Sequence, residues 1–383
     1  MRFPKKLSDK LKKRIDKDSL RHLPENNDFI DFSSNDYLGI SKSKTVFEAS
    51  HSYLLAHNIF INGATGSRLL SGNHKLYHCL EQQICEFHQS EAALVFNSGY
   101  DANIGFFSSV PQRGDLIFYD EFIHASVRDG IKMSDAKSYK FTHNNIKNLE
   151  DLFTRHSESN QAIFVVTESV FSMDGDCPDL VEMSQLVNAY EGFLIVDEAH
   201  AVGLFGERGY GIVQDLNITA DVFARIITFG KALGSHGAAI LGSKELKQYL
   251  INFSRSFMYT TGLSPHTIAT THQAYDYLQS SKGQIKIEKL KENITFFKEE
   301  TQRLTLQDFF IQSNSAIHCC MISGNEIVKK VAAQIQNKGF DVKPILSPTI
   351  PEGQERLRFC LHSYNSKEEI TKVLETLCTF VLR

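Results

Sequence analysis

Short apolar runs rich in Ile, Val and Phe alternate with amphipathic stretches through the middle of this 383-residue chain. This alternation is the feature that most restricts the possible folds, because such runs are typical of strands that helices cover on both faces. We expect strands at residues 92–96, 115–120, 162–169, 192–200, 225–230 and 238–242. We expect helices between several of them, at residues 103–110, 125–134, 148–157 and 180–191.

The order of strand, helix and strand predicts right-handed crossovers and an α/β fold with a largely parallel sheet. We expect the last apolar runs of the series to form an antiparallel edge. After about residue 265 a long charged helical stretch, 266–304, leads into short strands and two further helices, at 326–340 and 367–383. The predicted division is an N-terminal helix and strand segment, a large α/β domain and a smaller α+β domain, at residues 1–45, 46–270 and 271–383.

The basic N-terminus, MRFPKKLSDKLKKRIDK, places Leu7, Leu11 and Ile15 four residues apart, which predicts an amphipathic surface helix. The net charge of −4 and the pI of about 6.4 give no basic field that would attract nucleic acid. The chain has no apolar stretch of about 18 residues, so we expect no membrane span and a cytoplasmic protein.

The seven cysteines form no C-x-x-C pair, and Cys319 and Cys320 are adjacent. This spacing suits neither a disulfide framework nor a zinc site. We therefore expect free thiols and no metal.

Ligands of an α/β sheet collect at the carboxyl ends of its strands. Polar groups follow four of the expected strands, namely Ser98, Gly99 and Tyr100; Glu168, Ser169 and Ser172; Asp197, Glu198 and His200; and Thr228 and Lys231. The first group opens a helix, whose free N–H groups favour an anion such as phosphate.

Each of these residues also has an ordinary structural explanation. Lys231 alone could be a solvated charge, Asp197 could cap a helix, and His124 and His200 could be hydrogen-bonded core histidines. Their joint occurrence favours a cofactor with a phosphate, a ring nitrogen and an aldehyde, which describes pyridoxal 5′-phosphate. No G-x-G-x-x-G, P-loop or H-E-x-x-H motif supports a different cofactor.

Six segments in order then carry a family resemblance: SSNDYLG (33–39), GATGSRLLSGN (63–73), FNSGYDAN (96–103), ESVFSMDGD (168–176), VDEAHAVGLFGERGYG (196–211) and TFGKALG (228–234). This set resembles the α-oxoamine synthase family over almost the whole chain, from about residue 20 to about residue 365. The resemblance implies an enzyme of the aspartate aminotransferase fold that uses pyridoxal 5′-phosphate. Such enzymes join an amino acid to an acyl thioester with loss of CO2.

The resemblance also implies roles for individual residues. Lys231 would bind the cofactor covalently and move the substrate α-proton, and Asp197 would pair with the ring nitrogen. His200 would contact the 3-oxygen of the ring, while His124 would stack on its face. The remaining cofactor contacts would come from Ser98, Gly99, Tyr100, Ser172 and, on the phosphate, Thr228.

For the substrates, Arg358 in RLRFCL resembles the arginine that holds the amino-acid carboxylate. Arg21 and Thr349 match positions that contact the substrate. The segment FMYTTGLSP (257–265) resembles one that reaches the phosphate in the neighbouring subunit, which implies a homodimer with shared active sites.

Within the family, the short N-terminus, the length and the segment SPTIPEGQERLRFCL (347–361) most resemble the members that act in biotin biosynthesis. These join L-alanine to a pimeloyl thioester of coenzyme A or a carrier protein. Two positions depart from the pattern: LHSYNS (361–366) replaces a frequent histidine-threonine pair, and Leu346 stands where some members carry an arginine.

Other activities stay open beside this one. Sister members use glycine with an acetyl thioester or serine with a palmitoyl thioester, and RFCL resembles the second kind. A plain aminotransferase and a non-catalytic partner subunit are further alternatives. The presence of Lys231, His124 and Asp197 argues against the non-catalytic one.

Overall fold

The computed structural model describes residues 3–17, 19–21, 23, 28–156 and 161–381. The chain forms two compact units. The larger consists of Asn35–Ser172 and Asp176–Lys289, and the smaller of Met1–Ser34, Met173–Gly175 and Leu290–Arg383. The division at residues 45 and 270 that the sequence suggested stays a prediction.

A seven-stranded sheet forms the centre of the larger unit, with the strand order β2-β8-β7-β6-β5-β3-β4. Six of these strands are the predicted ones: β2 (Ala92–Phe96), β3 (Leu116–Asp120), β5 (Ile163–Glu168), β6 (Phe193–Asp197), β7 (Ala224–Thr228) and β8 (Ala238–Gly242). The sequence did not predict β4 (Lys137–Phe141). Its residues KSYKF are mostly exposed at the edge of the sheet, so no apolar run marks the strand.

The sheet is parallel from β7 to β4, and β8 runs antiparallel to both of its neighbours. The antiparallel direction expected for the last strand of the series is confirmed. Its expected position at the edge is wrong, because β2 pairs with its outer side and the edges are β2 and β4. The small side chains of AAILG allow burial between two neighbouring strands.

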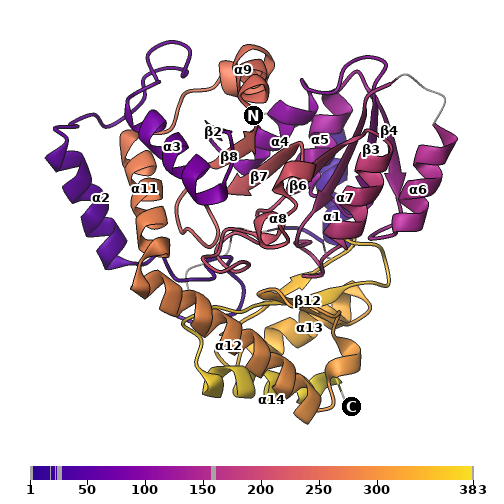
Figure 1. The fold of residues 1–383 in the computed structure, drawn as a ribbon. Coiled ribbons are helices and arrows are strands. Elements are labelled where there is room, and N and C mark those ends of the chain that lie inside the picture. Colours follow the sequence, from indigo (N-terminus) through magenta and orange to yellow (C-terminus); the bar gives the residue numbers. More distant parts are fainter. Residues whose placement is uncertain (1–2, 18, 22, 24–27, 157–160, 382–383) are drawn as a thin grey trace. The chain divides into compact units, whose positions relative to one another are not determined.

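Two hydrophobic cores cover the two faces of this sheet. Figure 1 shows the helices that flank the sheet. Successive residues of a strand alternate between them, so that Ile117 packs in one core while Leu116 and Phe118 pack in the other. The first core includes α4 (Gly99–Phe107), α5 (Ala125–Met133), α9 (Lys244–Phe253) and α10 (Arg255–Met258). The second includes α6 (Ile146–Arg155), α7 (Leu180–Ala189) and α8 (Ile212–Asp215).

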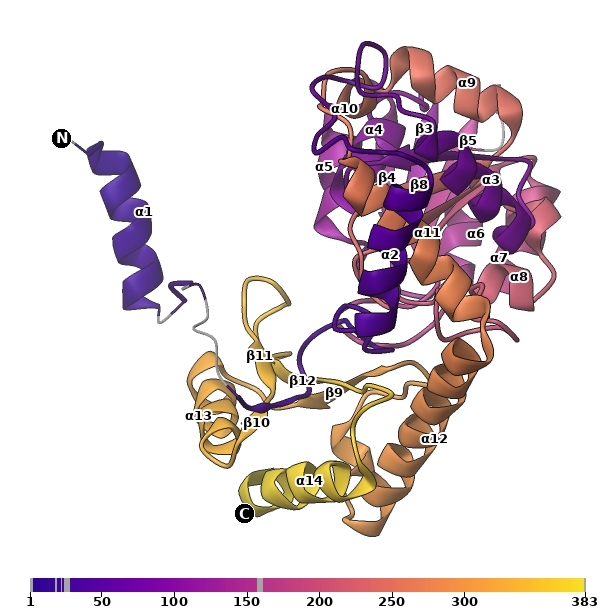
Figure 2. The same ribbon diagram turned by 90° about the vertical axis from the view of Figure 1, so that its left-hand side faces the viewer.

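Three further helices, α2 (Lys44–Ala56), α3 (Leu76–His88) and α11 (Pro265–Gln279), pack beside the β2 end of the sheet. Figures 1 and 2 show α2 and α11 side by side. The helical stretch predicted at 266–304 is two helices, because Ser280 adopts an extended conformation between α11 and α12 (Ser281–Arg303). Two short 3-10 turns are also present, η1 (Thr219–Asp221) in the larger unit and η2 (Gln307–Phe309) in the smaller unit.

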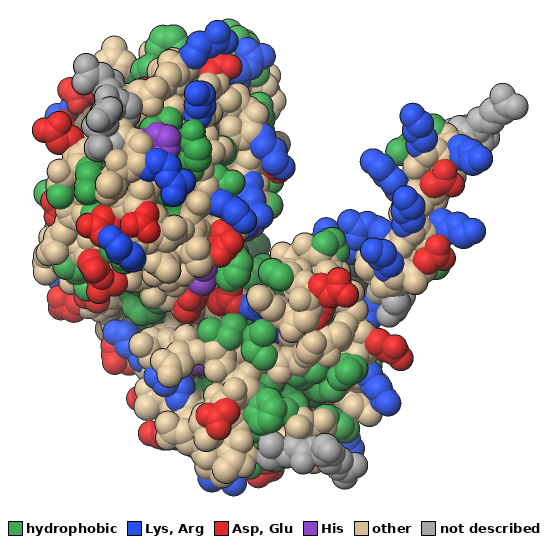
Figure 3. All heavy atoms as spheres, turned by 90° about the vertical axis from the view of Figure 1, so that its right-hand side faces the viewer, with side chains coloured by type: hydrophobic (Ala, Val, Ile, Leu, Met, Phe, Trp, Pro, Cys, Tyr) green, Lys and Arg blue, Asp and Glu red, His purple; other side chains and the backbone are tan. Residues whose placement is uncertain are grey.

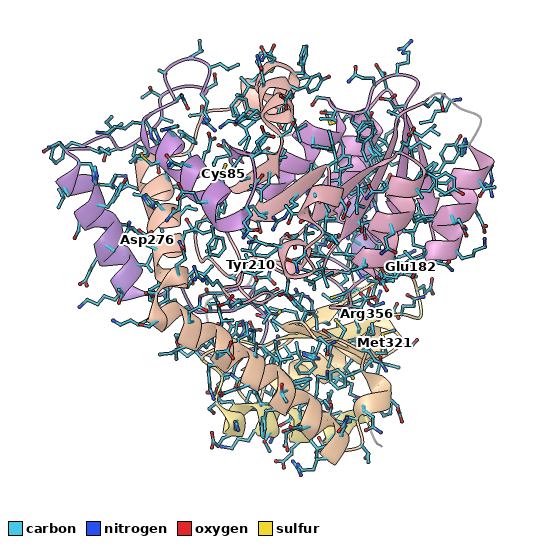
Figure 4. All side chains as sticks on the ribbon, viewed as in Figure 1. Cys85, Glu182, Tyr210, Asp276, Met321 and Arg356 are labelled. Atoms are coloured by element: carbon cyan, nitrogen blue, oxygen red, sulfur yellow. The ribbon has the colours of Figure 1, made fainter. Side chains whose placement is uncertain are left out.

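The smaller unit has the expected α+β composition. Its antiparallel sheet has the order β11-β12-β9, and β1 pairs with β10 in parallel. Arg356, labelled in Figure 4, lies on β12 and forms a buried ion pair with Asp174. Besides η2 and the part of α12 from Leu290 onward, the elements of this unit are α1 (Lys5–Asp16), β1 (Ile30–Asp31), β9 (Ile317–Met321), α13 (Asn325–Gln336), β10 (Phe340–Asp341), β11 (Lys343–Ile345), β12 (Arg356–Cys360) and α14 (Lys367–Val381).

The predicted N-terminal helix is present as α1, and its apolar residues Leu7, Leu11 and Ile15 are all exposed. Figure 3 shows Lys and Arg side chains along this helix. Among the described residues, no helix has both the length and the apolar character needed to cross a membrane. All seven cysteines are free, as expected.

Candidate active site

A cavity of about 300 Å³ in the larger unit lies where β5, β6 and β7 end. It gathers eight of the nine residues predicted to bind a cofactor: Ser98, Gly99, Tyr100, His124, Asp197, His200, Thr228 and Lys231. The ninth, Ser172, is not among the lining residues, and its backbone N–H donates to Glu168 instead. The strand ends therefore meet as the parallel topology requires.

Asp197 is the last residue of β6, and it is held as an acceptor at both carboxylate oxygens. Its Oδ1 accepts the backbone N–H of Ala199 at 2.9 Å, which is the local capping contact that an aspartate after a strand commonly makes. Its Oδ2 accepts Nδ2 of Asn103 at 3.1 Å, and the same amide nitrogen reaches Oγ of Ser126 at 3.0 Å. Asp197 is 5% exposed, so this fixed negative charge faces the cavity rather than bulk water.

His124 caps the first turn of α5 from the cavity wall. Its Nδ1 accepts the backbone N–H of Ser126 at 3.2 Å and lies 2.7 Å from Oγ of the same serine. Burial lowers the pKa of His124, and the positive charge of Lys231 lowers it further. The negative charge of Asp197 acts in the opposite direction without cancelling the effect of burial. The result is a neutral imidazole with a fixed orientation, which suits a ring that stacks on a flat cofactor.

His200 is buried, and its orientation is set by residues of the SSNDYLG segment. Its Nδ1 lies 2.7 Å from the hydroxyl of Tyr37, which donates to Oδ1 of Asn35 at 3.2 Å. Asn35 also lines the cavity. The resemblance of this segment to the family implies no role for Asn35 or Tyr37, so the structure adds both residues to the site.

The start of α4 forms a cradle that fits a phosphate. Ser98 is the N-cap and accepts the backbone N–H of Asp101 at 3.0 Å. A Cβ atom on Gly99 would lie 2.7 Å from Cγ2 of Thr228, so a side chain at this position would displace the threonine. In the described part of the chain, Oγ1 of Thr228 is buried without a hydrogen-bond partner. A buried hydroxyl without a partner is unfavourable, and it marks a place for a polar ligand group.

Lys231 lies two residues beyond Phe229 in the loop that follows β7, and it is half-buried in the cavity wall. The loop is closed by a hydrogen bond of 2.8 Å from the N–H of Gly234 to the carbonyl of Lys231. Gly234 has a φ of +58°, and a Cβ there would lie 2.2 Å from the backbone nitrogen of Ser41, so the turn requires glycine. Lys231 is therefore a cavity residue and not a solvated charge at a strand end.

The residues predicted to bind substrates belong to the smaller unit. Arg358 lies on β12, is 8% exposed, and donates to Sγ of Cys360 at 2.8 Å. Nη2 of Arg21 donates to Oγ1 of Thr349 at 3.4 Å. The structure thus brings together two of the three predicted substrate residues, which are 328 positions apart in the sequence.

Comparison with known proteins assigns the chain to a family. It matches the family model of aminotransferase class I and II over residues 27–377, and so it belongs to this family. The 8-amino-7-oxononanoate synthase of Emericella nidulans is 39% identical, over 98% of this chain and 95% of the relative. A putative 8-amino-7-oxononanoate synthase of Haemophilus influenzae is 36% identical, over 90% of each chain.

Two solved structures resemble the fold throughout. The 8-amino-7-oxononanoate synthase of Francisella tularensis has a TM-score of 0.79 at 28% identity, covering 93% of this chain and 99% of the other. A serine palmitoyltransferase of Sphingomonas wittichii has a TM-score of 0.82 at 28% identity, covering 92% and 86%. The predicted aminotransferase-like fold is confirmed.

The protein is an enzyme that uses pyridoxal 5′-phosphate, as the sequence predicted. The cavity fits this cofactor on three observations. Thr228, whose hydroxyl has no hydrogen-bond partner among the described residues, lies beside the first turn of α4, where a phosphate would sit. Asp197 presents a fixed carboxylate, and Lys231 presents an amine from the same wall.

Proposed function

We propose that this enzyme joins L-alanine to a pimeloyl thioester and releases 8-amino-7-oxononanoate, CO2 and the free thiol, a step of biotin biosynthesis. The observation that carries the proposal is the 39% identity to an 8-amino-7-oxononanoate synthase over 98% of the chain. The cytoplasmic location stays a prediction.

When it is bound, pyridoxal 5′-phosphate supplies an aldehyde that condenses with amines and a ring that accepts the electron pair of the α-carbon. Asp197 keeps the ring nitrogen protonated, because its fixed charge favours the cationic form. Lys231 would hold the cofactor through its amine and would move the α-proton of the substrate. His124 stacks on the ring and excludes water from that face.

The other cavity residues orient the same cofactor. Thr228 would donate its hydroxyl, which is buried without a partner among the described residues, to the phosphate. The first turn of α4 would add backbone N–H groups from Gly99 and Tyr100. His200, whose ring is oriented by Tyr37, would contact the 3-oxygen of the ring. Each contact reduces the freedom of the ring before the substrate arrives.

Arg358 binds the carboxylate of L-alanine, because a guanidinium can donate two parallel hydrogen bonds to it. By orienting the amino acid through its carboxylate, Arg358 would favour loss of the α-proton over early loss of CO2. Arg21 and Thr349 bind the second substrate. Leu346 has no charged group, so a residue other than Leu346 binds the distal carboxylate of the pimeloyl chain.

We propose a homodimer with shared active sites. Thr260 and Thr261 lie in the segment predicted to reach the partner's phosphate, and Nδ2 of Asn97 holds both, at 3.1 Å to the Thr260 hydroxyl and 2.6 Å to the Thr261 carbonyl. Large apolar side chains of the larger unit are exposed, as at a surface that a second copy covers. They include Phe47, Leu55, Phe60, Ile61, Leu69, Leu70 and Tyr259.

A sister activity with serine and a long acyl thioester is the second candidate, favoured by the TM-score of 0.82 to a serine palmitoyltransferase. Glycine with an acetyl thioester is a third pairing. A non-catalytic partner subunit is disfavoured, because Lys231, Asp197 and His124 line one cavity.

Product identification by mass spectrometry tests the proposal. The purified enzyme is given L-alanine, glycine or serine, each with acetyl, pimeloyl and palmitoyl thioesters. We expect the nine-carbon amino ketone from L-alanine and the pimeloyl thioester at the highest kcat/KM. Absence of this product beside turnover of another pair would overturn the biotin assignment and leave the cofactor chemistry intact.

A further inference from the structure

Glu168 is a buried acidic residue of the cofactor cavity to which the proposed function gives no role. It is the last residue of β5, is 3% exposed, and contributes to the cavity lining. A buried carboxyl group has a high cost unless hydrogen bonds or charges compensate it. Its position therefore requires an explanation of its own.

The sheet register places Glu168 directly beside Asp197. The two residues are paired on β5 and β6, which are adjacent parallel strands. Paired residues of neighbouring strands project from the same face and lie about 5 Å apart. Two carboxyl groups on such paired positions of a buried site do not both ionise readily, because each negative charge disfavours the other.

Of the two, Glu168 is the group that retains its proton. Burial, followed by the charge of Asp197, raises the pKa of Glu168 to about 8. The charge of Lys231 and the backbone N–H groups of His124 and Ser172 act against this rise without cancelling it. Asp197, in contrast, is tied to the amide of Asn103, which donates and so favours a carboxylate.

Glu168 also makes a short contact with the residue predicted to stack on the cofactor. Its Oε1 accepts the backbone N–H of His124 at 2.6 Å. From His124 the hydrogen bonds continue through Ser126 to Asn103 and back to Asp197. Glu168 and Asp197 thus lie at the two ends of one chain of hydrogen bonds around the cavity. The two residues are also neighbours in the sheet, because they are paired on β5 and β6.

We propose that Glu168 is a positioning residue that anchors His124 in the cavity as a neutral carboxylic acid, while Asp197 carries the negative charge. A neutral group can hold the N–H of His124 through its carbonyl oxygen. An ionised Glu168 would instead add a second negative charge that stabilises the ammonium form of Lys231, which is not nucleophilic. The inference rests on the proposed function only in taking Lys231, Asp197 and His124 as cofactor residues.

Two substitutions separate anchoring from charge. Glu168→Gln keeps the shape and the carbonyl acceptor and is always neutral, whereas Glu168→Leu removes the acceptor. The matched control is Glu300→Gln, a buried glutamate of the smaller unit that pairs with Arg303. The first measurement is the Kd of the cofactor-free full-length chain for pyridoxal 5′-phosphate, by fluorescence titration at pH 7.

We expect Glu168→Gln and Glu300→Gln to bind within about threefold of the unmodified protein, and Glu168→Leu to bind at least about tenfold more weakly, as the loss of a buried hydrogen bond predicts. Equal weakening by Glu168→Gln and Glu168→Leu would show that the carboxylate is required and would overturn the proposal. Unchanged binding by Glu168→Leu would show that Glu168 anchors nothing, which also overturns it.

The second measurement is the urea unfolding free energy of the cofactor-free chain from pH 5 to pH 9. The folded chain keeps the proton of Glu168 to about pH 8, while the unfolded chain releases it near the ordinary value for glutamate. The stability of the unmodified protein relative to Glu168→Gln must therefore fall as the pH rises towards about 8 and level off above it. If the difference in unfolding free energy between the unmodified protein and Glu168→Gln does not change with pH, Glu168 is not neutral in the folded chain and the proposal is wrong. Neither measurement uses L-alanine or a thioester, so a wrong substrate assignment leaves their outcome unchanged. The second measurement needs only Glu168→Gln, so it applies even if Glu168→Leu fails to fold.

Discussion

The predicted cofactor residues of the larger unit and the predicted substrate residues of the smaller unit are held in different ways. Asp197 and Thr228 end two neighbouring strands of a buried sheet, and hydrogen bonds from α4 and α5 fix the groups around them. In the smaller unit, Arg21 and Thr349 are exposed and share one hydrogen bond of 3.4 Å, and only Arg358 lies within a strand.

This difference indicates a division of tasks. Chemistry at the cofactor requires fixed geometry and low solvent exposure, which strand ends provide. Substrate choice within a family changes more readily when the selecting residues lie on exposed segments. Substitutions in the larger unit should therefore affect the cofactor first, and those in the smaller unit should affect the KM for a substrate while the cofactor stays bound.

The largest effect is expected from Lys231→Ala. Loss of the amine removes the group that binds the cofactor and moves the α-proton, so kcat should fall by about 10³-fold or more. Steady-state turnover with circular dichroism as a check of folding measures it. Lys244→Ala, an exposed lysine at the start of α9, is the control and should retain full activity. If Lys231→Ala turns over substrate as fast as the unmodified protein, the assignment of the cofactor chemistry to the larger unit is wrong.

Arg358→Met should raise the KM for L-alanine by about 100-fold, since charged hydrogen bonds to a carboxylate contribute about 1.5–3 kcal/mol. The absorbance of the bound cofactor should not change, because the substitution lies in the smaller unit. Kinetics at varied L-alanine concentration measure the first effect and a visible spectrum the second. The control is Arg303→Met, which removes an arginine that pairs with Glu300 and Glu375. If Arg358→Met leaves the KM for L-alanine unchanged but loses the cofactor, Arg358 serves cofactor binding and not substrate binding.

Thr228→Val should weaken the binding of pyridoxal 5′-phosphate by about tenfold, the effect of one lost hydrogen bond to a charged group. The cofactor-free protein should be as stable as before or more stable, because the variant removes a buried hydroxyl that has no partner within the described residues. Fluorescence titration and urea unfolding give the two values. Thr154→Val, at an exposed threonine on α6, serves as control. A large loss of stability would show that the hydroxyl has a structural role instead.

The smallest effect on activity, below about threefold, is expected from a histidine outside the cavity. Although burial lowers the pKa of His143, its hydrogen bonds to Asp120 at 2.9 Å and Asp176 at 2.8 Å raise the value to about 9. Because the folded-state pKa exceeds the ordinary value for histidine, this stabilisation is complete below about pH 6.5 and is lost as the pH rises through about 9.

His143→Asn should therefore lower the free energy of unfolding by about 2 kcal/mol at pH 6, as expected for charged hydrogen bonds, and by less at pH 10. Urea unfolding at both pH values measures the change. A loss that grows with pH would contradict the charged state of His143.

Much of the larger unit was predictable because its physical signals are local. Continuous apolar runs marked β2, β5 and β6, and polar residues at their ends marked the cavity. The exposed edge strand β4 gave no such signal. The position of β8 between two strands depends on long-range pairing with β2, which sequence periodicity does not encode.

The same distinction applies to the site. Lys231, Asp197 and Thr228 could be found, because each follows an apolar run directly. Asn103 and Ser126 were missed, since both lie within predicted helices, where their spacing resembles that of ordinary polar residues. Glu168 was noticed at its strand end, but its role depends on the register with Asp197, which only the structure gives.

Borohydride reduction of the purified holoenzyme followed by peptide mass mapping tests the central claim most directly. We expect the added pyridoxyl phosphate mass on the peptide that contains Lys231 and on no other lysine peptide. A label on a different lysine, or no label in a protein that binds the cofactor, would contradict the account.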